Sequence, residues 1–243
     1  MKYQIFPISE NAVTIDFGNE ISVHLNEKVI ELSEFIEKNP FAGFIEFVPA
    51  YSSLTIFYDL ITVKKNYAEV STAFSFTKSF IEKSMKSLET INFEKNAPIK
   101  IPVDYSEKFA PDLEFVAANA KLSKNEVIKI HTNQIYRVFM IGFLPAFAYM
   151  GEVDERIATP RRQTPRTKIE KGSVGIAGKQ TGIYPLESPG GWQIIGRTET
   201  ELFRPKNKEI SLLKTGDLVQ FFDINNNPKS QVQNRNEHYY SIK

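Results

Sequence analysis

Hydrophobic residues in the first third of the chain alternate between strand and helix spacing. Short apolar runs predict strands at residues 3–6 and 13–17, and Pro7 and Asn11 separate them. The next apolar positions recur at helical spacing and predict an amphipathic helix with Ser22 as its cap. The buried stripe of this helix is Leu25, Val29, Leu32 and Ile36.

The same order of elements is then repeated. Strands are predicted at residues 44–48 and 54–58, with a Pro49-Ala50 turn between them, and a second helix is predicted over residues 70–88. Two strands followed by a helix, twice over, predict a small sheet covered by helices on one face, an α+β layer. We assign this first domain to residues 1–93.

A polar break at residues 93–98 begins a second domain, assigned to residues 94–224. After a strand at 99–103, one short helix is predicted near Pro111-Asp112, and a second begins at Ser123, which forms an S-x-x-E capping box with Glu126. Further strands are predicted at residues 135–141, 173–176, 192–196 and 218–222. Many short strands with Gly/Pro corners predict a barrel or a sandwich, followed by a polar tail at 225–243.

Composition narrows the class of protein. The 243 residues are 42% hydrophobic, which indicates a globular chain, and the net charge of +1 favours neither nucleic acid nor an anionic membrane as a partner. The absence of cysteine excludes disulfides, thiolate catalysis and Cys-zinc sites. We see no signal peptide and no apolar run long enough to span a membrane, so we expect a cytoplasmic protein.

One long stretch, residues 140–203, combines recurrent Gly and Pro with clustered arginines and the only tryptophan. Shaped loops of this kind are common at binding and catalytic sites. Residues 154–171 carry six basic and three acidic side chains. This excess is typical either of a face for an anionic ligand or partner or of a solvated loop, and taken alone it favours the loop. The arginines are Arg156, Arg161, Arg162 and Arg166.

A nucleotide-binding P-loop is not predicted. Gly178-Lys179 is similar to the end of one, but Gln180 stands where Ser or Thr is required and Ser173 where the first Gly is required. Pro185 follows too soon for a helix to begin there.

The three histidines lack metal-ligand spacing, so no metal site is predicted. His131 follows a predicted helix and precedes a strand. The residue pattern alone favours a structural histidine near a helix C-terminus over a general base or substrate ligand. The histidines are His24, His131 and His238.

Several polar and glycine positions allow both a structural and a functional interpretation. Ser188 lies in no nucleophile elbow and is expected to shape a turn, while Gly190-Gly191 indicates close backbone approach or positive φ. Trp192 suits a core anchor or an interface equally. The polar groups among the glycines suit either turns or the binding of a small polar ligand. They are Gln180, Thr181 and Tyr184.

The same stretch resembles the KipI/PxpB family, also called allophanate hydrolase subunit 1 or carboxyltransferase subdomains C and D. The resemblance covers the chain to about residue 223. Its main strings are Gly-Phe-Leu-Pro at 142–145, Ala-Thr-Pro-Arg-Arg at 158–162, Gly-Ser-Val-Gly-Ile-Ala-Gly-Lys-Gln-Thr-Gly-Ile-Tyr-Pro at 172–185, Ser-Pro-Gly-Gly-Trp at 188–192 and Ile-Gly-Arg-Thr at 195–198. Shorter matches are Val-Pro-Ala-Tyr at 48–51, Ile-Pro-Val at 101–103 and Pro-Asp-Leu at 111–113.

The resemblance implies an N-terminal α+β domain and a C-terminal cyclophilin-like β-barrel. It implies a non-autonomous, PxpB-like subunit of an ATP-dependent 5-oxoprolinase, in which a lactam or amide substrate, 5-oxo-L-proline, is hydrolysed to L-glutamate. The implied partners are PxpC-like and PxpA-like (LamB/YcsF) subunits, and the isolated chain is expected to be inactive. Two alternatives stay open: a KipI-like inhibitor of a sensor histidine kinase, and subunit 1 of an allophanate- or urea-degrading enzyme.

We predict a set of site residues within this resemblance. His131, Arg161, Arg162 and Gln180 are the candidate catalytic residues. Arginines at 161 and 162 are suited to holding a carboxylate or phosphate, although one of two adjacent arginines commonly pairs internally. The candidate ligand-binding residues are Thr181, Tyr184, Arg197, Gly190, Gly191 and Trp192.

One loop departs from the family pattern. The family usually reads G-F-L-P-G-F-P-Y, whereas this chain has Ala146 and Ala148 in place of Gly and Pro. If the family glycine has a positive φ, we expect Ala146 to cost about 1 kcal/mol or the loop to move.

Overall fold

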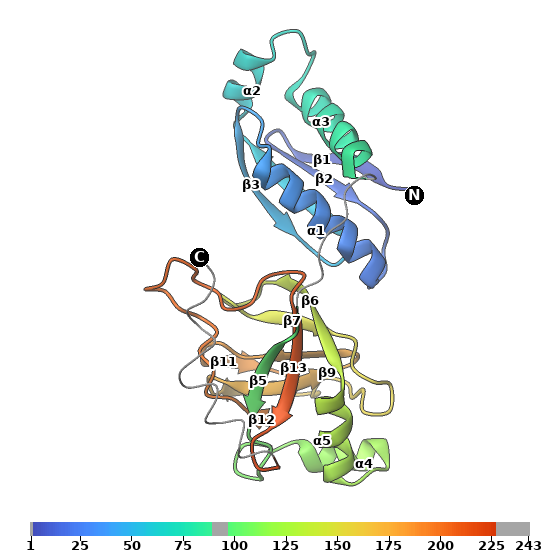
Figure 1. Cartoon of the computed structure of the whole chain (residues 1–243), viewed down its shortest axis with the longest axis vertical. Helices are drawn as coiled ribbons and strands as arrows, with labels where there is room; N and C mark the ends of the chain where they lie inside the picture. The colour runs from blue at the N-terminus through green and yellow to red at the C-terminus, as the bar shows by residue number, and fades with distance from the viewer. Residues whose placement is uncertain (1, 89–96, 227–243) are drawn as a thin grey trace. The chain divides into compact units, whose positions relative to one another are not determined.

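The computed structural model describes residues 2–88 and 97–226. The chain divides into two compact units, Met1–Lys95 and Asn96–Lys243, drawn from blue to teal and from green to red in Figure 1. The predicted boundary after residue 93 falls outside the described residues, as does the predicted tail beyond residue 226. Both units mix helices and strands, so the predicted α+β class is confirmed.

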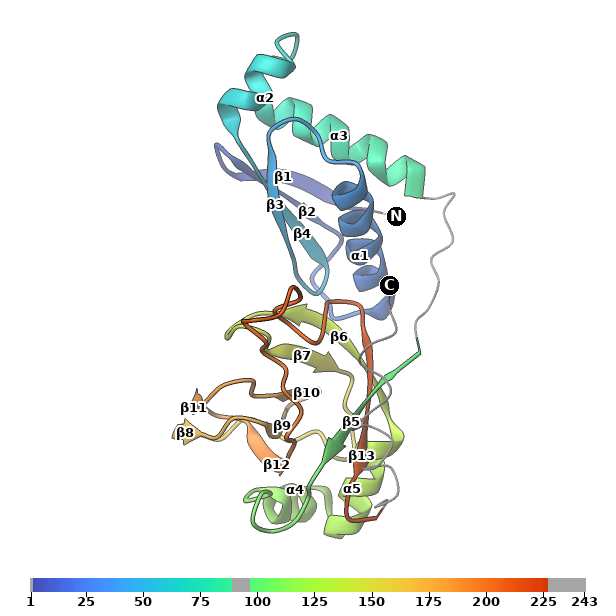
Figure 2. The ribbon, with the colours of Figure 1, turned by 60° about the vertical axis from the view of Figure 1, so that its left-hand side comes forward.

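The N-terminal unit is a four-stranded antiparallel sheet in the order β1-β2-β4-β3. Two long helices, α1 and α3, lie against one face of this sheet (Figures 1 and 2). The strands are β1 (Gln4–Ser9), β2 (Ala12–Asp16), β3 (Phe44–Pro49) and β4 (Ser53–Tyr58). The helices are α1 (Val23–Lys38), α2 (Leu60–Asn66) and α3 (Ala73–Leu88).

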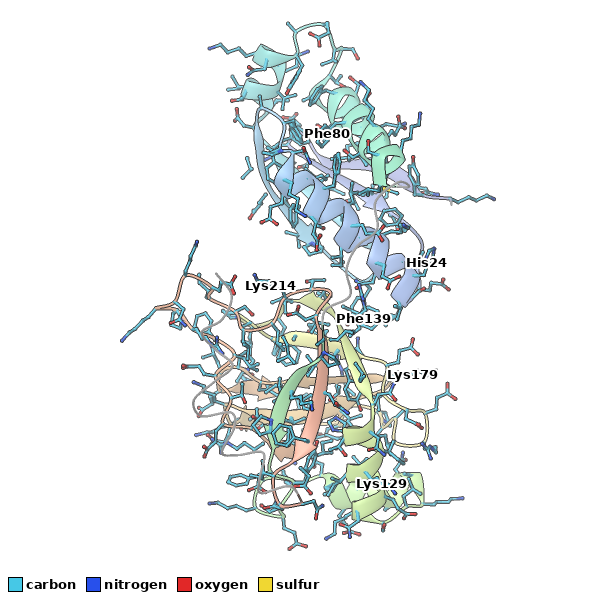
Figure 3. The ribbon with its side chains drawn as sticks, viewed as in Figure 1. His24, Phe80, Lys129, Phe139, Lys179 and Lys214 are labelled. Carbon is cyan, nitrogen blue, oxygen red and sulfur yellow. The ribbon has the colours of Figure 1, made fainter. Side chains whose placement is uncertain are left out.

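The core of this unit follows from the two apolar patterns in the sequence. The predicted stripe of α1 is buried, and on the facing sheet Val13 pairs with Ile56 and Ile15 with Leu54 across the central strands. Phe80 on α3, labelled in Figure 3, packs against the same core. The helical and strand periodicities therefore point at one another, as a two-layer unit requires.

Three local features of this unit differ from the sequence-based expectations. Pro7 does not end its strand, because β1 is an edge strand in which an absent N–H costs no internal pairing. Ser22 occupies the N-cap of α1, but its side chain makes no capping hydrogen bond. Helix α2 was not predicted; the Asp59 carboxylate caps it by accepting from the Thr62 N–H at 2.7 Å.

The C-terminal unit is built on a seven-stranded sheet in the order β12-β9-β10-β7-β6-β13-β5. Its pairs are antiparallel except β13 with β5. A separate two-stranded ribbon joins β8 (Arg166–Ile169) to β11 (Ser188–Gly190). The seven strands are β5 (Ile99–Val103), β6 (Ile135–Ile141), β7 (Ala148–Gly151), β9 (Ser173–Ala177), β10 (Gln180–Ile183), β12 (Gln193–Arg197) and β13 (Leu218–Asp223).

The two outermost strands of this sheet meet. Asp104, the residue after β5, pairs with Arg197 of β12 through two backbone hydrogen bonds of 2.7 and 2.9 Å. The sheet therefore curls into a nearly closed barrel, which leaves few unpaired edge groups. This agrees with the barrel domain that the family resemblance implies.

Two helices lie between β5 and β6. Helix α4 (Leu113–Ala120) contacts β12, and α5 (Lys124–Asn133) packs on β13 and on α4. The predicted capping box is confirmed, because Ser123 N–H donates to the Glu126 carboxylate at 2.8 Å and Glu126 N–H donates to the Ser123 hydroxyl at 3.3 Å. The box sets where α5 begins and so places His131 on its last turn.

The loop that departs from the family pattern has unusual backbone geometry. Ala146 has a φ of +64° and Phe143 a φ of +70°, in the region that favours glycine. The loop has therefore not moved to accommodate alanine at 146, and the strain expected there is present.

Candidate functional site

His131 lies inside the barrel unit and is fully buried. Both ring nitrogens have partners: Nδ1 is 2.8 Å from the Tyr105 hydroxyl and Nε2 is 3.0 Å from the Thr181 hydroxyl. Thr181 in turn donates to the Gly175 carbonyl at 3.0 Å. The imidazole also stacks on Phe221, with 4.7 Å between ring centroids. We call His131, Tyr105 and Thr181 the interior cluster.

Burial sets the protonation of this cluster. Desolvation lowers the pKa of His131 to about 3, so the ring is neutral at physiological pH. Desolvation also raises the pKa of Tyr105 well above its ordinary value. A neutral imidazole with both nitrogens engaged satisfies the hydrogen bonds of the core, and this geometry fits the structural interpretation of His131.

The segment 158–166, which we call the arginine loop, is pinned to the barrel at several points. The Gly178 N–H donates to the Thr159 carbonyl at 2.7 Å, and the Gln193 amide donates to the Pro160 carbonyl at 2.9 Å. The Arg162 N–H donates to the Gly191 carbonyl at 2.7 Å. Backbone hydrogen bonds therefore hold the arginines in place despite the irregular course of the loop.

Asp112 is the hub of the charges around this loop, and its side chain is 4% exposed. Its carboxylate accepts from Arg162 at 3.0 Å and from the fork of Arg166 at 2.7 and 2.8 Å. It also accepts from the Ile194 N–H at 2.6 Å, while the Asp112 N–H donates to the Ile194 carbonyl at 2.9 Å. This single carboxylate ties α4, β8, β12 and the arginine loop together.

Trp192 is a core residue of the same region. Its ring is 4% exposed and meets Phe147 edge to face at 5.4 Å, and Tyr184 packs on the same phenyl ring at 5.3 Å. Burial raises the pKa of Tyr184 to about 12. The exposed Arg161 lies over the indole, with 5.9 Å from its guanidinium carbon to the ring centroid. Of the two interpretations of Trp192, the core anchor describes its place in this chain.

The double glycine before Trp192 shows close approach at one position only. A Cβ on Gly190 would collide with the Tyr184 hydroxyl and the Ile169 side chain, whereas a Cβ on Gly191 would meet nothing closer than 3.6 Å. Neither glycine is among the residues with positive φ. Gly190 is therefore required for packing, and Gly191 is not.

A cavity of about 160 Å³ opens beside this charge network. Four cationic side chains and one carboxylate line it, together with a Phe109 ring that two of the cations approach. The Lys108 ammonium lies 4.9 Å and the Arg197 guanidinium 5.6 Å from the centroid of that ring. Its lining residues are Lys108, Phe109, Pro111, Arg166, Lys168, Ile169, Glu170, Ser173, Ile194 and Arg197. We call this the basic cavity.

The predicted site residues are thus divided among separate places. His131 and Thr181 are in the interior, and Arg197 lines the basic cavity. Gln180 lies in β10, paired with Ala177 of β9 and Gly151 of β7. The remaining residues gather around the arginine loop and Trp192: Arg161, Arg162, Tyr184, Gly190, Gly191 and Trp192.

Sequence reasoning missed two functional candidates, Asp112 and Phe109. The unbalanced positive charge of residues 154–171 was the available signal, because partly buried arginines require a carboxylate from elsewhere. That signal does not name the carboxylate, which is 50 residues away from Arg162 in the sequence.

Gly178-Lys179, the rejected P-loop fragment, forms the two-residue turn of the β9–β10 hairpin, with Gly178 at a φ of +60°. Lys179 lies at the outside of the barrel unit (Figure 3) and pairs with Glu155. Within residues 2–88 and 97–226, no three His, Asp or Glu side chains are grouped as a metal site would require. Over the same residues, no helix has the length and apolar character needed to cross a membrane.

The fold and the cavity together define a class: two-part proteins in which a small α+β unit precedes a nearly closed barrel bearing a basic pocket. Residues 3–213 match the family described as "Carboxyltransferase domain, subdomain C and D". This chain belongs to that family, as the resemblance predicted.

Known relatives match the chain over most of its length. A PxpB-type 5-oxoprolinase subunit of Bacillus subtilis (strain 168) is 46% identical over 226 residues, which are 92% of this chain and 94% of that protein. The crystal structure of TTHA0988 has a TM-score of 0.75 at 31% identity and covers 87% of this chain, which spans 40% of that longer chain. The "Urea amidolyase" of Saccharomyces cerevisiae is 26% identical over 232 residues, which are 87% of this chain but 13% of that protein.

Proposed function

We propose that this chain is the PxpB-like subunit of a 5-oxoprolinase that hydrolyses 5-oxo-L-proline to L-glutamate. The observation that carries the proposal is the match along almost the whole of both chains with the 5-oxoprolinase subunit of Bacillus subtilis. The urea amidolyase supports a related fold, but this chain corresponds to only 13% of it. A free-standing subunit therefore describes this chain better than a fragment of a urea-degrading enzyme does.

Two facts support the requirement for partners. The region similar to this chain occupies 40% of TTHA0988 and a small part of urea amidolyase, so related units occur beside further protein segments. We propose that here the neighbours are separate chains, a PxpC-like barrel subunit and a PxpA-like (LamB/YcsF) subunit. We expect the complex to act in the cytoplasm and the isolated chain to have no hydrolase activity.

ATP is the proposed co-substrate, since a lactam is stable and its carbonyl must be activated before water attacks. The described residues of this chain do not fit ATP. The basic cavity, at about 160 Å³, is smaller than pockets for drug-sized ligands, which have roughly 300 Å³ or more. The Gly178-Lys179 turn has no helix behind it. We therefore place ATP binding on the partner subunits.

Reconstitution tests the proposal. The chain is purified with its PxpC-like and PxpA-like neighbours, and glutamate formed from 5-oxoproline is measured with and without ATP. We expect ATP-dependent glutamate formation only when all three subunits are present. Turnover by the isolated chain, or equal turnover without it, would overturn the proposal.

Affinity purification from the native cell is the complementary test. A tag on the N-terminus of the chain should recover the PxpC-like barrel subunit in stoichiometric amounts. Recovery of a sensor histidine kinase without that subunit would replace the proposal with the inhibitor alternative.

A further inference from the structure

The basic cavity contains cationic groups that the protein itself does not neutralise. Arg166 gives its fork to Asp112, and Lys168 pairs with Glu170 and Glu187. The Arg197 guanidinium, by contrast, makes no hydrogen bond or ion pair with any residue in 2–88 or 97–226; its nearest described partner is the Phe109 ring. Lys108 approaches the same ring and likewise makes no direct ion pair within those ranges. Two cations thus face one small cavity with donors to spare.

Ser173 adds a neutral donor beside Arg197. The two residues are directly opposite in the β9–β12 register, so their side chains lie on the same face of the sheet. Both line the cavity, and the Ser173 hydroxyl makes no hydrogen bond within the described part of the chain. An arginine fork next to a hydroxyl suits a planar carboxylate.

The remaining walls are apolar. Phe109, Pro111, Ile169 and Ile194 line the cavity, and the two isoleucines are buried. The position of Ile194 is fixed by its two backbone hydrogen bonds with Asp112, so the wall is rigid. A ligand with one anionic end and a compact, weakly polar body would match both sides of such a cavity.

We propose that the basic cavity binds a small monocarboxylate, with Arg197 and Ser173 on its carboxylate and Phe109 and Ile194 against its body. The identity of the ligand rests on the proposed function: within a 5-oxoprolinase it is the substrate lactam or the product amino acid. The cavity volume of about 160 Å³ fits an amino-acid-sized molecule and excludes a nucleotide. Arg197 is then a substrate-binding residue.

Isothermal titration of the full, isolated chain tests this directly. The probes are 5-oxo-L-proline, 2-pyrrolidinone, which is the same lactam without the carboxylate, and inorganic phosphate. We expect 5-oxo-L-proline to bind and the other two to bind at least tenfold more weakly. Amide chemical shifts of Phe109, Ser173 and Arg197 should move on binding. No binding, equal binding of pyrrolidinone or tighter binding of phosphate would overturn the proposal.

Variants locate the ligand. Arg197→Met keeps the aliphatic stem and should weaken binding ten- to a hundredfold, since a charge-assisted fork is lost. Arg197→Lys keeps the charge without the fork and should fall between. Arg156→Met removes an exposed arginine that pairs with Asp154 outside the cavity and should bind as the parent does. Unchanged affinity in a folded Arg197→Met protein would overturn the site.

The two proposals can fail separately. If the reconstituted complex hydrolyses 5-oxoproline but the isolated chain binds none, the cavity proposal falls and the proposed function stands. If the chain binds 5-oxoproline through Arg197 but the complex has no turnover, the proposed function falls and the carboxylate site stands.

Discussion

Two groups of polar residues in the barrel unit look alike in sequence and differ in structure. The interior cluster of His131, Tyr105 and Thr181 is fully buried, and each member has a partner within it. The charges around the arginine loop and the basic cavity lie at the surface, and there Arg197 keeps its hydrogen-bond donors unused by the described residues. A partnered group stabilises a fold, whereas an unpartnered one is available to a ligand.

The largest effect we expect comes from removing the hub of the surface group. Asp112→Ala leaves two arginines and the Ile194 N–H without their acceptor, and it should lower the free energy of unfolding by about 3 kcal/mol. Chemical denaturation measures this loss. Asp154→Ala, which removes the partner of the exposed Arg156, is the matched control and should cost much less. Equal costs would mean that Asp112 is an ordinary surface acid.

The double glycine offers a matched pair beside the same loop. Gly190→Ala places a methyl group against Tyr184 and Ile169 and should destabilise the protein by about 2 kcal/mol, an overpacking effect. Gly191→Ala has open space and should change stability by less than about 0.5 kcal/mol. Thermal melting of both variants gives the comparison. A reversed order would show that the packing around Trp192 is not as described.

Acid sensitivity should arise from the interior cluster. Burial lowers the pKa of His131 to about 3 in the folded state against an unfolded value near 6.5, so the unfolded chain binds more protons between these values. The stability due to the neutral ring is complete above pH 6.5 and is lost as pH falls toward 3, by up to about 1.4 kcal/mol per pH unit.

The test of that pH dependence is the difference between the parent and His131→Gln. Both proteins carry the same carboxylates, so their other titrations cancel. Denaturant unfolding at pH 7, 6, 5 and 4 should show a shallower fall for the variant. Parallel curves would contradict the burial of a neutral histidine.

The smallest effect concerns the loop where this chain departs from its family. Ala146 has a positive φ, so Ala146→Gly should relieve about 1 kcal/mol of backbone strain and offset the lost methyl packing. The result should lie within about 0.5 kcal/mol of the parent. Ala148→Gly, in β7 and fully buried, has no such relief and should cost about 1 kcal/mol or more. Differential scanning fluorimetry ranks the two; a greater loss for Ala146→Gly would argue against the strained loop.

Much of the fold could be predicted because its signals are local. The α1 stripe, the Ser123–Glu126 capping box and the strand at 135–141 were each predictable from a few neighbouring residues. The elements missed are short or lack periodicity. β7, β8, β10 and β11 have three or four residues each, and their pairing partners are set by the closed sheet rather than by their own sequence.

The candidate site was predictable only in part, for the same reason. The resemblance drew attention to Arg197 and to the arginine loop, but the spacing of His131 could not say whether its ring faced a cavity or the core. The Asp112 carboxylate reaches Arg162 and Arg166 across 50 and 54 residues, and the Phe109 ring meets Arg197 from before α4. Such contacts depend on barrel closure, which no local pattern encodes.

The most direct test of this division is a kinetic comparison in the reconstituted three-subunit complex. Turnover of 5-oxo-L-proline is measured for the parent, His131→Gln and Arg197→Lys at neutral pH, below the melting temperature of each. We predict that His131→Gln keeps kcat and KM within about threefold of the parent, while Arg197→Lys raises KM about tenfold or more, as expected for a lost fork to a carboxylate. A folded His131→Gln complex without turnover, beside an unaffected Arg197→Lys complex, would contradict the account.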